Sequence, residues 1–91
     1  VLFRHRSNFD FWYAIIEVKE GVTMYREVFP SRMKQARKEA GLSQREVAEL
    51  TGISLSNIAK YETGKLEPDL EKLGIIATFY QKSADYFIGK Q

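Results

Sequence analysis

Apolar residues recur at helical spacing from Pro30 to the end of the chain, and this pattern predicts five helices. The first should begin at Pro30, because proline suits the first turn of a helix, where its missing N–H costs no hydrogen bond. It should end at Gly41, a residue type that readily adopts the left-handed conformation at a helix C-terminus. The other four are expected between Ser43 and Gly52, Ser54 and Gly64, Asp69 and Tyr80, and Ser83 and Gly89. Residues 29–91 are therefore predicted to form an all-α, five-helix domain.

Several predicted helices begin with residues that satisfy free backbone groups. Ser43 and Glu46 have the spacing of a capping box, in which each side chain accepts a hydrogen bond from the other residue's backbone N–H. Ser54 and Ser83 are N-cap residue types at the start of the third and fifth helices. The inward stripes are expected to comprise Met33, Ala36, Arg37 and Ala40 in the first helix and Leu70, Leu73, Ile76, Ala77 and Tyr80 in the fourth.

Residues 1–28 form an N-terminal extension of different character, rich in aromatic and β-branched residues. Two strands are predicted there, over residues 12–19 and 22–29, with Glu20-Gly21 as the turn between them. Such a β-hairpin would bring together the cross-strand pairs Trp12 with Phe29 and Ile16 with Tyr25.

Two interpretations of the N-terminal extension remain open at this stage. A two-stranded hairpin needs an apolar surface to cover it, and Ile75 and Phe79, which lie off the core stripe of the fourth helix, are candidates for that surface. Alternatively, Lys19-Glu20-Gly21 can be encoded by a purine-rich stretch that resembles a bacterial ribosome-binding site just before the Met24 codon. In that case the protein starts at Met24, and residues 1–23 are an upstream segment.

Composition narrows the class of protein. The 91 residues suffice for one small domain, and the absence of cysteine excludes disulfides and zinc–thiolate sites. No apolar run approaches the roughly 20 residues that span a bilayer, and the first residues lack the order of a signal peptide, so we expect a cytoplasmic protein without a membrane partner. The net charge of +2 is too small for coating nucleic acid without sequence preference. If DNA is the partner, the basic groups must be concentrated on one face.

The segment from Gln44 to Lys65 has the spacing of two crossing helices joined by a tight turn. Ala48 is small where the helices approach each other, and Gly52 falls at the turn, where a positive φ is expected. Ile58 and Tyr61 lie one turn apart on the inward face of the second of these helices. The N-terminal half of that helix is thus left exposed, as insertion into the DNA major groove requires.

These residues resemble the lambda-repressor-like (Cro-like) family of helix-turn-helix transcriptional regulators. The similarity covers residues 29–89 and rests on the combination of Gly41-Leu42-Ser43-Gln44, Ala48, Gly52-Ile53-Ser54, Glu62-Thr63-Gly64-Lys65 and Pro68. It implies a five-helix DNA-binding domain, and a repressor that binds a palindromic operator in double-stranded DNA as a homodimer. Gly74 departs from the apolar residue that the family usually has in the fourth helix.

The resemblance, together with helix geometry, indicates which residues contact DNA. Contacts to phosphates are expected from Ser43, Gln44, Thr63 and Lys65, and contacts to bases, through the helix Ser54–Thr63, from Leu55, Ser56, Asn57 and Lys60. Leu55 can touch a thymine methyl group, Asn57 can pair with adenine or bind a phosphate instead, and Lys60 can donate to guanine. The family also pairs the positions of Arg37 and Glu62, so a largely buried ion pair is expected between them.

An enzyme gains little support from the sequence. His5 is the single histidine, and there is no cysteine nucleophile, glycine-rich phosphate loop or metal-ligand cluster, so we expect no catalytic residue, metal, cofactor or small-molecule ligand. The stronger alternative to a DNA-binding regulator is an antitoxin-like or other protein-interaction module with the same fold. The homodimer interface is expected around Tyr86 and Phe87 or in the N-terminal extension.

Overall fold

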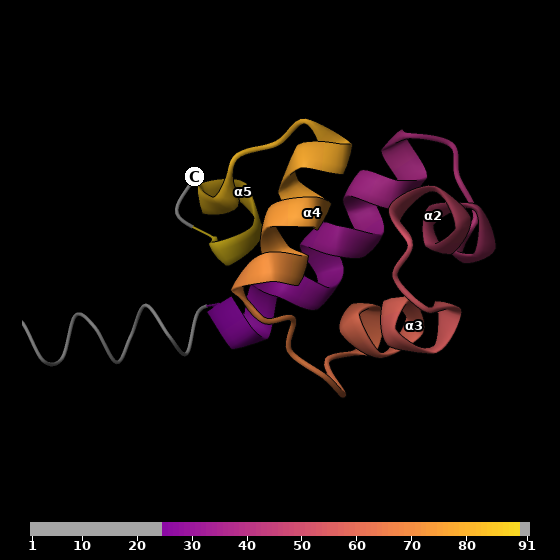
Figure 1. Cartoon of the computed structure of the whole chain (residues 1–91). Coiled ribbons are helices and arrows are strands. Elements are labelled where there is room, and N and C mark those ends of the chain that lie inside the picture. The colour runs from indigo at the N-terminus through magenta and orange to yellow at the C-terminus, as the bar shows by residue number, and fades with distance from the viewer. Residues whose placement is uncertain (1–24, 90–91) are drawn as a thin grey trace, which may run out of the picture.

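In the computed structural model, residues 25–89 are described, and they form five helices and no strand (Figure 1). The first helix covers residues 25–39 of this range. The others are α2 (Gln44–Thr51), α3 (Leu55–Thr63), α4 (Leu70–Tyr80) and α5 (Ala84–Ile88). The all-α, five-helix fold expected from the sequence is thereby confirmed. Within residues 25–89, no helix has the length and apolar character needed to cross a bilayer.

The first helix starts earlier than the sequence pattern indicated. Residues 25–29 are helical, so the prediction of a strand over residues 22–29 is wrong for this part, and Pro30 lies inside the helix rather than at its start. The reason is tertiary packing: Phe29 and Met33, one helical turn apart, are 2% and 0% exposed, and the ring of Tyr25 lies 5.6 Å from that of Phe29. Burial of this face outweighs the weak strand preference of aromatic and β-branched residues.

The predicted hairpin cannot form, because residues 25–29 of its second strand are helical. Phe29, the expected partner of Trp12, is a core residue of the first helix, and Tyr25, the expected partner of Ile16, packs against that core. The predicted strand over residues 12–19 and the Met24 alternative lie outside the described residues. The first helix also runs across residues 28 and 29, where the sequence pattern had placed the start of the domain.

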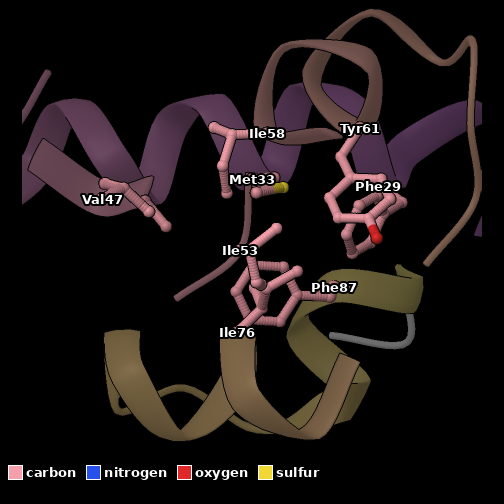
Figure 2. Packing of buried hydrophobic residues seen from close by; sticks show 9 residues of the cluster. Phe29, Met33, Val47, Ile53, Ile58, Tyr61, Ile76 and Phe87 are labelled. Carbon is pink, nitrogen blue, oxygen red and sulfur yellow. The ribbon is translucent and has the colours of Figure 1, made fainter. Parts of the chain in front are cut away.

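One hydrophobic core joins all five helices (Figure 2). Phe87 from α5 is fully buried, and its ring lies 5.8 Å from Phe29 of the first helix and 6.3 Å from Tyr80 of α4. Arg32 ties α5 to the first helix again, because its Nη1 donates to the Tyr86 carbonyl oxygen at 2.6 Å. The buried apolar residues are Phe29, Met33, Ala36, Val47, Ile53, Ile58, Tyr61, Ile76 and Phe87.

Three expectations about burial are wrong. Leu70 is 87% exposed, whereas Pro68, two residues before it, is buried. Ala40, at the end of the first helix, is exposed as well. Phe87 is 0% exposed, so it belongs to the core and cannot also form a surface for a second subunit.

Two substitutions to alanine test this assignment of core and surface. Phe87→Ala should lower the free energy of unfolding by about 3–5 kcal/mol, because it empties a fully buried aromatic site. Leu70→Ala, the control, should change it by less than about 0.5 kcal/mol, since the leucine is almost fully exposed. Urea denaturation of both variants gives the comparison, and equal losses would contradict the assignment.

Candidate nucleic-acid interface

The helix-turn-helix consists of α2, a short turn and α3. At the start of α2 the Ser43 side chain accepts from the Glu46 N–H at 3.0 Å, and Glu46 accepts from the Ser43 N–H at 2.8 Å, which completes the capping box. The hydrogen bond that the Glu46 carboxylate accepts from the Ser43 N–H is the main reason why the pKa of this carboxyl lies below its usual value. Gly52 ends α2 with φ 78°, a conformation that strains any residue with a side chain. Buried Ile53 then anchors the turn to the core.

Helix α3 presents two chemically different faces. Ser54 caps its N-terminus by accepting from the Asn57 N–H at 3.1 Å. Ile58, Tyr61 and Glu62 are buried on the inner face. Among the residues expected to contact bases, Leu55, Ser56 and Lys60 are exposed, and Asn57 is half-buried. Leu55 is 37% exposed at the first position of the helix.

Three of the four residues expected at phosphates lie at the ends of these helices with polar groups near the surface. Ser43 uses its oxygen as the N-cap acceptor, which leaves the O–H available as a donor. Thr63 donates its hydroxyl to the Ala59 carbonyl at 3.1 Å, and its oxygen can still accept. Lys65 is exposed in the loop after α3, where its backbone N–H donates to the Lys60 carbonyl at 3.0 Å.

Gln44 lies differently from the other three. Its Nε2 donates to Glu62 Oε1 at 3.1 Å, so the side chain points toward the inner face of α3. No sequence pattern indicates this contact, because tertiary structure brings together two residues that are 18 positions apart. The neighbouring Arg45 is exposed in the first turn of α2 and was overlooked as a basic group at a helix N-terminus. That terminus carries backbone N–H groups without intrahelical acceptors, which favours anions.

An ion pair fixes the far end of α3. Arg37 Nε lies 2.8 Å from Glu62 Oε2 and Arg37 Nη2 lies 3.1 Å from Glu62 Oε1, which is a bidentate arrangement. The side chains are 13% and 1% exposed. Arg37 Nη1 also donates to the Leu42 carbonyl at 2.9 Å. The Glu62 carboxylate therefore connects the first helix, α2 and α3.

Tyr80 of α4 borders this ion pair. Burial raises the pKa of its phenol to about 12, the negative charge of Glu62 adds to the rise, and Arg37 opposes it. Its hydroxyl is buried without a hydrogen-bond partner among residues 25–89. The pKa of Arg37 is raised too, and here the main cause is the hydrogen bond with Glu62. The polar network thus lies in a water-poor environment, where its hydrogen bonds are stronger than at the surface.

Two crossing helices, a glycine turn and an outward-facing strip on the second helix define a helix-turn-helix protein. A family model described as helix-turn-helix matches residues 33–87. The chain belongs to this lambda-repressor-like family, whose members are transcriptional regulators and not enzymes.

Three relatives from Bacillus subtilis (strain 168) illustrate the similarity. The HTH-type transcriptional regulator ImmR is 39% identical over 59 residues, which cover 65% of this chain and 46% of the relative. The SPbeta prophage-derived uncharacterized HTH-type transcriptional regulator YonR is 36% identical, over 67% of this chain and 56% of its own length. The HTH-type transcriptional regulator AnsR is 33% identical, over 66% and 52%. The chain thus spans about half the length of the relatives it matches, and no solved structure matches it.

Neutralising one half of the buried ion pair tests its role. Glu62→Gln keeps the shape of the side chain but strands the Arg37 charge in a mostly buried site, so the free energy of unfolding should fall by about 3–5 kcal/mol. The control is Glu67→Gln, which breaks an exposed pair with Arg26 and should cost at most about 1 kcal/mol. Thermal and urea unfolding report both values. A Glu62→Gln variant as stable as the control would show that the pair does not hold α3 in place.

Proposed function

We propose that this chain is a sequence-specific DNA-binding repressor that reads a palindromic operator as a homodimer through the helix from Ser54 to Thr63. The observation that carries the proposal is the division of α3, whose inner face is buried while Leu55, Ser56 and Lys60 are exposed on its outer face. A helix anchored in this way can enter the major groove without disturbing the core. On this proposal the protein acts in the cytoplasm, where the DNA of a bacterial cell lies.

On this proposal the exposed strip of α3 provides the base contacts. Ser56 and Lys60 lie one helical turn apart, so both side chains can face the same stretch of groove. Lys60 donates to the guanine acceptors, and Leu55 packs against a thymine methyl group. Asn57, which is half-buried, contacts adenine or the nearest phosphate from the edge of the strip.

The phosphate contacts would flank this strip on two sides. Ser43, Gln44 and the overlooked Arg45 lie at the N-terminus of α2, where the helix dipole favours an anion. Thr63 and Lys65 follow α3 on the other side. The Gln44 side chain can serve both partners, since one N–H donates to Glu62 and its second N–H can donate to a phosphate.

A homodimer is proposed because one recognition helix alone contacts a short stretch of DNA. A single α3 contacts few base pairs and would discriminate poorly among the many sites of a genome. Two copies related by a two-fold axis would contact half-sites about 34 Å apart on one face of the DNA. Repression then requires only occupancy, because a dimer bound over a promoter excludes other proteins from it.

Alanine variants of two lysines separate base contacts from phosphate contacts. Lys60→Ala should cost about 1–3 kcal/mol of binding free energy on the preferred operator and much less on unrelated DNA, because a base contact is lost. Lys65→Ala should weaken binding to all sequences by a similar factor and reduce the magnitude of the salt slope by about one, because one fewer counterion is released.

Both variants lose the same charge, which makes each the matched control of the other. Titration against operator and scrambled duplexes at two salt concentrations gives the comparison. Identical profiles would mean that α3 does not read bases through Lys60.

A further inference from the structure

An open groove runs between α2 and α4, with a volume of about 520 Å³. Leu50 and Thr51 line it from α2, and Gly74, Ile75, Thr78 and Phe79 line it from α4. Leu50 is 65% exposed, and Ile75 and Phe79 are only partly buried although they pack against the core. Residues 25–89 thus leave apolar side chains from two helices uncovered along one groove.

Gly74 points to a close approach in this groove. It is helical, whereas the other four glycines among residues 25–89 have positive φ values at turns and helix ends. A Cβ added to it would meet no atom within 4 Å. Neither backbone conformation nor packing within the described domain therefore requires glycine, which is a poor residue for a helix interior. A glycine in such a position is suited to a neighbour that packs directly against the backbone.

We propose that this groove is the docking site of the chain's own apolar segment from Phe9 to Val18. This segment includes Phe11, Trp12 and Ile16 and is the most apolar part of the N-terminal extension. It cannot pair with residues 25–29 as a hairpin, because these residues are helical and Phe29 is buried in the core. Its side chains need another apolar surface, and the groove supplies one.

Reach and charge are compatible with this occupant. Residues 19–24 connect this segment to the first helix and span up to roughly 20 Å when extended, which is close to the length of about 22 Å of the first helix, so the segment can fold back along the domain. Arg4 and Arg6 precede the apolar segment, and Glu71, with a side chain 77% exposed, lies at the groove wall. A second copy docked groove to groove would leave the apolar segment of each chain uncovered, so it is the weaker occupant.

The single tryptophan of the 91-residue chain, Trp12, makes the proposal testable by fluorescence. The emission maximum should lie at a shorter wavelength than that of a free tryptophan peptide and should not change with protein concentration. Gly74→Gln places a polar side chain in the groove, where the open space tolerates it, and should shift the emission to that of exposed tryptophan. Leu50→Ser should shift it in the same direction.

Leu70→Ser is the matched control, because Leu70 is exposed on the same helix but does not line the groove; its emission should equal that of the unmodified chain. Far-UV circular dichroism checks whether each variant is folded. If Leu50→Ser does not fold, Gly74→Gln alone decides the test. The proposal would be overturned if the unmodified chain emitted at the wavelength of a solvent-exposed tryptophan. It would also be overturned if Gly74→Gln left the emission maximum unchanged. A concentration-dependent emission would also overturn it, because it would assign the groove to a second copy.

Discussion

The carboxylate of Glu62 is the point on which the arrangement of the helix-turn-helix depends. It is 1% exposed and receives hydrogen bonds from Arg37 of the first helix and Gln44 of α2 while belonging to α3. A buried charge is tolerated only with such partners, so three helices have to meet in one geometry. An ion pair of this kind need not add net stability compared with an apolar core. Its effect is to fix where α3 lies.

With its inner face fixed by Glu62, Ile58 and Tyr61, α3 has only its outer face left for a partner. That face is short and carries few charges, and the chain as a whole has a net charge of only +2. If this chain binds DNA as proposed, long-range attraction to the DNA is weak, and the preference for one site has to come from close contacts to the base edges. On the proposed function, the low charge would limit non-specific binding to unrelated DNA.

Local features of the fold were predictable from sequence, because they depend on residues close together in the chain. The capping box of Ser43 and Glu46 and the left-handed Gly52 are of this kind. The helical conformation of residues 25–29 was not predictable, since it depends on contact between Phe29 and Phe87, which are 58 positions apart in the sequence. Leu70 was misplaced as well, because helical spacing within α4 does not show which end of the helix extends beyond the core.

The sequence indicated which residues of α3 face outward, but not all the hydrogen bonds that hold its inner face. The outward positions of α3 follow from helical periodicity once its inner face is known, so the exposure of Leu55, Ser56 and Lys60 was predictable, and their contact with bases stays a prediction. The Arg37–Glu62 pair was expected only from family resemblance. The contact between Gln44 and Glu62 had no sequence signal, because a glutamine at a helix start looks the same whether it faces a phosphate or a buried carboxylate.

Selection of DNA from a random pool by the 91-residue chain tests most directly whether α3 reads sequence. We expect enrichment of one motif made of two inverted half-sites, with centres about 10 base pairs apart on one face of the duplex. The motif should be lost when residues on the outer face of α3 are replaced while the inner face is kept. A folded protein that enriches no sequence from the pool would contradict the central claim and would favour a protein partner for this surface.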